Sequence, residues 1–300
     1  MSASVSSASF NIRQIDIKFT LTGGATFDGS GGANQVTLTG RRIEAEVEKN
    51  GQANMGIATF RVYGMTFSQM NQLSTLGKPP GTFTPNEVYL LAGNPQDGKS
   101  TVFAGSVISA WIDFNGMPDV AFQVQAGGMI GPATASAAPT SYTGNVPAAT
   151  VLGDLATRSN LSFQNDGVTT ILTNPYYHGD LWGQIKDCCK EARCMYDAND
   201  NGALCIWPVG GSKNSVIPLI SPGTGMIGYP TFFPTGIIVR TMFNPSIRNG
   251  SFIQVQSALK QATGKWQVLN LSYAIASEVP DGPWEQRMEC VPPGYIPSDQ

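Results

Sequence analysis

The single histidine, His178, is the residue on which most hydrolytic mechanisms in this chain would depend. Ser–His–Asp and Cys–His mechanisms both need an imidazole as the general base. His178 lies in the segment PYYHGD at the start of an expected helix, where the helix dipole disfavours a protonated ring. Asp180 is too close in sequence to orient the imidazole, and the chain has no Gly-x-Ser-x-Gly motif. We therefore interpret His178 as a loop or capping residue.

Four of the five cysteines cluster in one short segment, at Cys188, Cys189, Cys194 and Cys205. On a helix at about 100° per residue, Cys188 and Cys194 point about 120° apart. No Cys-x-x-Cys spacing occurs, so convergence on zinc together with His178 would require the helix to break. The same helical geometry places one apolar set on the expected core face: Leu181, Ile185, Cys188, Ala192 and Met195. We interpret the cysteines as buried apolar side chains with free thiols.

A second metal motif begins at Asp197. Asp197, Asn199, Asn201 and Gly202 match the opening of a calcium loop, Asp-x-Asn-x-Asn-Gly. The twelfth position of such a loop should be a bidentate glutamate, and here it is Pro208. Residues 203–207 are also typical of a strand and not of the second helix of an EF-hand. The pattern therefore favours a β-turn over a calcium site.

Other enzyme signatures are absent or ambiguous. The Gly-containing segment 51–56 lacks the lysine and the strand–helix context of a phosphate-binding loop. A glycosidase needs two carboxylates about 5–10 Å apart, and no pair stands out among the 21 acidic residues. The tryptophans are scattered, and each fits a core or an interface: Trp111, Trp182, Trp207, Trp266 and Trp284. The sequence predicts no catalytic, cofactor-binding or metal-binding residue, and we expect no enzyme.

The composition favours a protein with a polar surface of low charge. Charged residues make up 13% of the chain, and the net charge is −3. The one adjacent basic pair, Arg41-Arg42, is followed by Glu44, Glu46 and Glu48. This balance argues against a dedicated nucleic-acid binder. The N-terminus has neither the basic start nor the apolar run of a signal peptide, and no stretch reaches the roughly 18 apolar residues of a membrane span.

The first third of the chain is expected to form β-strands with one helix. Apolar and polar residues alternate at 15–21, 43–48 and 58–62, which is the period of a half-buried strand. Thr66 and Gln69 fit a capping box in front of a short helix. Further strands are expected at 87–93, 101–114 and 119–126. The segment 23–34 is expected to be a loop and the segment 127–147 a linker.

The middle and the last third differ in character. Between 147 and about 210 we expect a short helix, a hairpin around Asn165-Asp166-Gly167, a helix from Gly179 to Arg193 and a second hairpin around 197–202. Beyond this small α+β region, strands are expected at 236–243, 251–257, 265–276 and 284–290. Their regular short spacing predicts a barrel or a small sandwich. The fold class is therefore mainly β, and α+β overall.

Two segments of the last third carry a resemblance: TGIIVRTMFNPSIRNGSFIQVQS at 235–257 and GKWQVLNLSYAIASEVPDGPWEQRMEC at 264–290. A strand ends in Phe-Asn-Pro, an Asn-Gly turn leads into a second strand, and a long strand pair includes a Gly-Pro-Trp step. In these features the chain resembles the baseplate hub proteins of contractile-tailed phages and the hub portions of contractile injection machines. Residues 41–49, 57–63 and 103–128 are similar to the first barrel of that family.

The resemblance implies a fold of two tube-like β-barrels with an α+β domain inserted between them. The expected divisions are a first barrel at 1–128, a linker at 129–146, the inserted domain at 147–212, a second barrel at 213–292 and an extended tail at 293–300. It also implies a homotrimeric ring that continues the tail tube, docks the central spike and contacts other baseplate proteins. No cofactor, no membrane insertion and no sequence-specific DNA binding are expected.

The implied location is the baseplate of the virion, after assembly in the host cytoplasm. Two alternatives stay open. One is a tail-associated cell-wall hydrolase, which would show a cleft with two close carboxylates. The other is a different virion β-protein, such as a tail tube or receptor-binding subunit.

Overall fold

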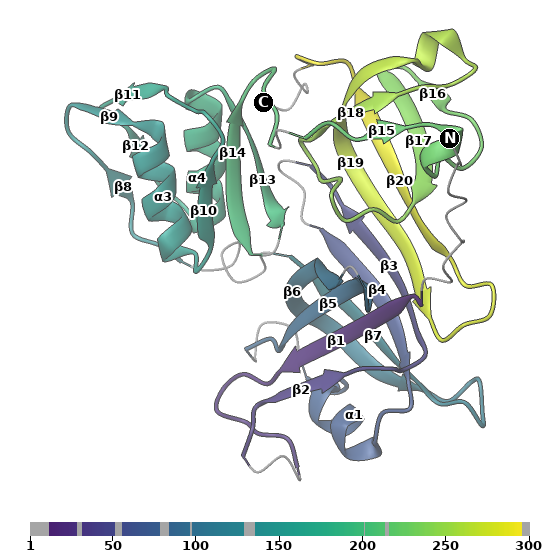
Figure 1. Ribbon diagram of the computed structural model, residues 1–300. Helices are drawn as coiled ribbons and strands as arrows, with labels where there is room; N and C mark the ends of the chain where they lie inside the picture. The colour runs from purple at the N-terminus through teal and green to yellow at the C-terminus, as the bar shows by residue number, and fades with distance from the viewer. Residues whose placement is uncertain are drawn as a thin grey trace.

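The protein consists of three lobes, which Figure 1 shows as a lower, a left and an upper right part. The computed structural model describes, apart from the side chains of 199 and 200, residues 12–28, 32–51, 56–78, 84–96, 98–128, 136–200, 202–213 and 216–295. Strands β1–β7 and helix α1 form the first lobe, β8–β14 with α3 and α4 form an α+β unit, and β15–β20 form the third lobe.

The first lobe follows the alternation of its sequence. In β3, Ile43, Ala45 and Val47 are buried, and the glutamates between them face outward. At α1, Thr66 Oγ1 accepts from Gln69 N while Gln69 Oε1 accepts from Thr66 N, which confirms the capping box. The elements are β1 (Gln14–Thr20), β2 (Gln35–Leu38), β3 (Ile43–Lys49), β4 (Ile57–Tyr63), α1 (Phe67–Leu73), β5 (Glu87–Asn94), β6 (Gly98–Asp113) and β7 (Ala121–Gly127).

The α+β unit packs two helices against a three-stranded sheet of order β10-β14-β13. Strands β8 and β9 lie in the segment expected as a linker and pair with β12 and β11. The elements are β8 (Thr140–Ser141), β9 (Asn145–Pro147), α3 (Ala148–Arg158), β10 (Ser162–Asn165), β11 (Ile171–Thr173), β12 (Tyr176–Tyr177), α4 (Leu181–Glu191), β13 (Cys194–Asp200) and β14 (Ala203–Pro208).

Two local predictions in this unit are wrong. The expected hairpin around 165–167 does not form, because β10 pairs in parallel with β14 while β11 pairs with β9. Asn165 Oδ1 instead accepts from the backbone of Gly167 and Val168 and turns the chain locally. The expected helix forms as α4 with Asp180 as its N-cap, but Met195, expected on its core face, lies instead on β13. The second hairpin, β13–β14, is confirmed.

The third lobe is built around a long antiparallel pair, β19 and β20. The chain from β15 to Met226 leaves a pairing with β18 and ends beside Thr241 of β17, so it links two edges of the lobe. The elements are β15 (Leu219–Ile220), η1 (Pro222–Thr224), β16 (Thr231–Phe233), β17 (Gly236–Met242), β18 (Phe252–Val255), η2 (Lys260–Ala262), β19 (Gly264–Ser277) and β20 (Trp284–Val291).

The length of β19 joins the first and third lobes. Its first residues, 264–267, pair with β18, and residues 271–277 pair with β3. The main path of the resulting sheet runs β16-β17-β20-β19-β3-β4-β7-β6-β5-β1-β2. The mainly β fold is thus confirmed. Two separate closed barrels are not confirmed. Among the described residues the strands of the first and third lobes belong to one continuous sheet, because the single strand β19 pairs with strands of both.

Candidate functional site

One face of the shared sheet carries mostly polar side chains across seven of its strands. Since side chains alternate along a strand, the residues opposite the core line up across strands. One such row crosses seven strands, from β17 to β6: Met242, Glu285, Ala274, Glu46, Thr59, Gln125 and Ser109. We call this surface the polar wall. It spans both lobes because β19 and β3 pair at its centre.

The polar wall carries more negative than positive groups. Within four residues of this row along each strand, its charged side chains are the carboxylates of Glu44, Glu46, Glu48, Asp113, Glu285 and Glu289 and the guanidinium groups of Arg61, Arg240 and Arg287. Arg240 lies 2.7 Å from Glu285, and Arg287 lies 2.9 Å from Glu289. The first pair joins β17 to β20, the second lies within β20, and exposed ion pairs of this kind contribute about 1 kcal/mol or less each.

Asp113 remains ionised on this wall. The backbone N–H of Asn115 donates to its carboxylate at 3.0 Å and is the main cause of a lowered pKa. The side-chain amide of Gln123 donates to the other oxygen, also at 3.0 Å, and acts in the same direction. The carboxylate therefore adds negative charge to the wall at any physiological pH.

Shallow, open grooves follow the wall. One of them measures about 470 Å³ and lies between β3, β4 and the turn 278–283. Glu44, Glu46 and Arg61 line it. Two further grooves of about 220 and 230 Å³ run along β19 and β20. Open troughs with mixed charge suit contact with a large passing or docking surface better than a small substrate.

The residues weighed as catalytic or zinc-binding do not converge. His178 is exposed and stacks on Tyr176, with ring centroids 6.1 Å apart. All five cysteines are buried and free of disulfides. Burial raises the pKa of Cys188 to about 12, so its thiol stays protonated and unreactive. Within the described residues, no three His, Cys, Asp or Glu side chains are grouped closely enough to hold a metal ion.

The calcium-loop motif also has another role. The Asp197 carboxylate lies 3.0 Å from the Lys213 ammonium, so the first residue of the motif is paired with a cation of the protein itself. Ala203 to Pro208 form β14, as the strand interpretation predicts. Asn201 lies outside the described residues, as do the side chains of Asn199 and Asp200.

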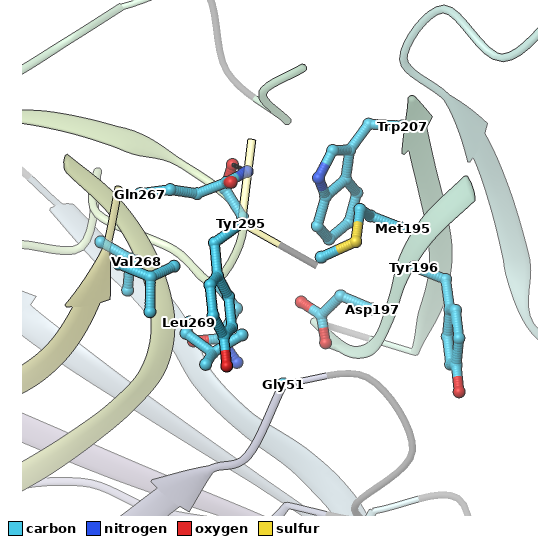
Figure 2. A pocket seen from close by; sticks show the side chains of 12 residues that line it. Gly51, Met195, Tyr196, Asp197, Trp207, Gln267, Val268, Leu269 and Tyr295 are labelled. Atoms are coloured by element: carbon cyan, nitrogen blue, oxygen red, sulfur yellow. Dashed lines mark hydrogen bonds between the residues drawn. The ribbon is translucent and has the colours of Figure 1, made fainter. Parts of the chain in front are cut away.

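The seam between the α+β unit and the rest of the molecule is the feature that sequence reasoning missed. Strand β14 is buried on both faces: Leu204 and Ile206 face the helices, and Cys205 and Trp207 face the seam. Figure 2 shows Trp207, Met195 and Asp197 on one side and Gln267 and Val268 of β19 on the other. Gln267 Nε2 donates to the Gly211 carbonyl at 2.9 Å. The run of apolar residues in 203–208 is the one sequence signal that indicates this seam, because a strand buried on both faces is apolar on both.

A comparison with protein families gives one match, which covers residues 16–282 and is described as baseplate hub gp41. No curated protein sequence matches the chain. Across the described residues, every helix is too short or too polar to span a bilayer.

Solved structures with the same fold come from tails and a secretion system. A tail protein of Neisseria meningitidis aligns with a TM-score of 0.64 and 7% identity, over 94% of this chain and 97% of its own. The 43 kDa tail protein of prophage MuSo2 from Shewanella oneidensis aligns with a TM-score of 0.60 and 9% identity, over 94% of this chain and 97% of its own. A type VI secretion component of Escherichia coli is described as structurally similar to the T4 tail proteins gp27 and gp5. It aligns with a TM-score of 0.58 and 11% identity, over 86% of this chain and 76% of its own. At such low identity these likenesses show the fold.

Proposed function

The chain belongs to the baseplate hub gp41 family, and we propose that three copies of it form a ring that joins the tail tube to the central spike of a phage. The structural role in a tail hub follows from the family. The number of copies, the ring and its neighbours are the proposed part. A structural family also supports the absence of catalysis.

The polar wall is the observation that carries the proposal. It is a single surface seven strands wide, continuous across two lobes, and its carboxylates outnumber its guanidinium groups. Such a surface lining an axial channel repels the phosphate backbone and lets DNA slide without binding. The continuity matters because a ring made from three chains needs each chain to cover a wide arc of the channel.

Exposed apolar side chains near opposite ends of the main strand path support contacts between neighbours in the ring. Phe67 and Phe114 stack at the α1 end and are 58% and 50% exposed. At the β16 end, Phe232 is 56% and Tyr229 is 68% exposed. Figure 1 places α1 and β16 far apart. A cyclic ring formed by head-to-tail contacts covers both ends in every copy and also shields the free edges of β2 and β16.

The division into domains is proposed with one adjustment. The scheme of 1–128, 129–146, 147–212, 213–292 and 293–300 follows the three lobes, and the pairing of β8 with β12 argues for starting the α+β domain near residue 140. This unit stands beside the sheet in Figure 1. We propose that it faces outward and contacts other baseplate proteins, while the first and third lobes contribute to the ring.

A cryo-EM map of the intact tail tip tests the proposal. Three copies around the axis, with the polar wall facing the channel and the chain between tube and spike, are the expected result. A peripheral position would favour a receptor-binding subunit. Release of soluble fragments from purified cell wall by the isolated protein would favour the hydrolase alternative.

A further inference from the structure

Residues of all three lobes line one small cavity. Its volume is about 10 Å³, and it is lined by Gly51 from the first lobe, Trp207 from the α+β unit and Asn249 from the third lobe, among others. Figure 2 shows the side chains that surround it. Trp207 and Asn249 are each 2% exposed or less.

Two polar atoms at this junction are buried without a hydrogen-bond partner among the described residues: Trp207 Nε1 and Asn249 Oδ1. The Asn249 side chain cannot simply turn away, because its Nδ2 donates to the Lys49 carbonyl at 2.9 Å. The Trp207 ring is equally constrained, since it packs so closely on Gly250 that a Cβ there would lie 2.4 Å from Trp207 Cζ2. Leaving such groups unpaired destabilises the fold, because each has lost its hydrogen bonds to water on burial.

The chemistry of the two atoms selects the occupant. An indole N–H is only a donor, and an amide oxygen is only an acceptor. A water molecule satisfies both, since it accepts from the one and donates to the other. A cation is excluded by the N–H, and an anion by the amide oxygen. A volume of about one probe sphere admits a single water and nothing larger.

We propose that this cavity is a site for one ordered water molecule that bridges Trp207 Nε1 and Asn249 Oδ1. Through Asn249 Nδ2 the same bridge reaches the Lys49 carbonyl at the end of β3, so the water connects all three lobes. The water thereby adds a second hydrogen-bonded link across this seam, besides the one from Gln267 to the Gly211 carbonyl. This site does not depend on the ring or on any partner.

A crystal structure of the chain at about 1.5 Å resolution tests the site directly. The expected result is one density peak within hydrogen-bond distance, about 2.7–3.2 Å, of both Trp207 Nε1 and Asn249 Oδ1. A dry cavity, or a direct contact between the two side chains, would overturn the proposal.

Water relaxation dispersion provides a second readout in solution. Trp207→Phe removes the donor, and we expect the number of long-lived buried waters to fall by one. Trp266→Phe is the matched control, because Trp266 Nε1 donates to the Ala262 carbonyl at 2.9 Å and holds no place at the cavity. An unchanged count in Trp207→Phe, or an equal fall in Trp266→Phe, contradicts the bridge. If Trp207→Phe fails to fold, the density peak in the crystal structure of the unaltered chain decides whether the water is present.

Discussion

The Lys213 ammonium lies 3.0 Å from the Asp197 carboxylate, and the two side chains are only 1% and 2% exposed. A buried pair of this kind is costly to break, because removing one partner leaves an uncompensated charge in the interior. We expect Lys213→Met to lower the free energy of unfolding by about 3–5 kcal/mol. Urea unfolding followed by tryptophan fluorescence measures this loss.

Two further variants separate the buried charge from lost packing. Replacing both partners, Asp197→Leu with Lys213→Met, is expected to recover most of the loss. Arg240→Met removes one partner of the exposed pair with Glu285, where Arg240 is 52% exposed, and is expected to cost about 1 kcal/mol or less. Equal losses for Lys213→Met and Arg240→Met would show that burial of the pair is not what stabilises the seam.

Gly250 is the second residue that holds the seam closed. Its φ is +77°, and an added Cβ would lie 2.4 Å from the Trp207 ring. We expect Gly250→Ala to destabilise the protein through both the backbone strain and the clash. Gly77→Ala is a matched control, since Gly77 has the same φ of +77° but no atom within 4 Å of an added Cβ.

The difference between these two alanine variants isolates the contact with Trp207. Strain alone costs roughly 1 kcal/mol in each, and overpacking adds about 1–3 kcal/mol in Gly250→Ala. Thermal unfolding measured by circular dichroism gives both values. If the two variants lose the same free energy of unfolding to within about 0.5 kcal/mol, roughly the limit for additivity between independent sites, the Trp207 side chain would move aside without cost.

The strands could be predicted because their sequences carry the period of the pleat, as Ile43 to Glu48 show. The joining of the two lobes could not. It depends on the second half of β19 extending past β18 to pair with β3, and no local pattern specifies a partner so distant in sequence. The hairpin at Asn165-Asp166-Gly167 failed for a related reason, since a local Asx turn and a parallel pairing with β14 compete with it.

The candidate site was visible only in part. The alternating glutamates of β3 indicate an exposed acidic strand, but the sequence does not show that Glu285, two strands away, and Arg240, three strands away, lie on the same face. The partner of Asp197 was equally hidden, because Lys213 lies in a loop without a motif. In both cases the missing information is which strands are neighbours, which is set by tertiary packing.

Alkaline pH is expected to destabilise the α+β unit. Burial raises the pKa of the Cys188 thiol from its ordinary value near 9.0 to about 12. Above pH 9 the unfolded chain therefore loses this proton while the folded chain keeps it, so stability is complete below pH 9 and is lost as pH rises toward 12. Burial also raises the pKa of Tyr142, from 10.0 to about 12, which acts in the same direction.

Denaturant unfolding at a series of pH values between 8 and 11 measures this loss. Cys188→Ala removes one titrating group, and its stability is expected to decline less steeply with pH than that of the unaltered chain. His178→Ala changes an exposed ring and serves as a control with the original slope. Parallel declines in all three proteins would contradict the role of Cys188.

The last prediction concerns the polar wall and rests on its proposed position in the channel. Glu46→Lys and Glu48→Lys replace outward-facing carboxylates of β3 with ammonium groups, which bind phosphate. Both positions are exposed, so the free energy of unfolding should change by about 0.5 kcal/mol or less. In phage particles whose hub carries both substitutions, we expect DNA release to slow severalfold at low salt and to recover as salt screens the charges.

Asp187→Lys makes the same change of charge on the exposed side of α4 and should leave the rate unaltered. Particles that assemble normally and release DNA at the original rate with both wall substitutions would place the wall outside the path of the DNA, whereas slowing by Asp187→Lys as well would indicate a general effect of net charge.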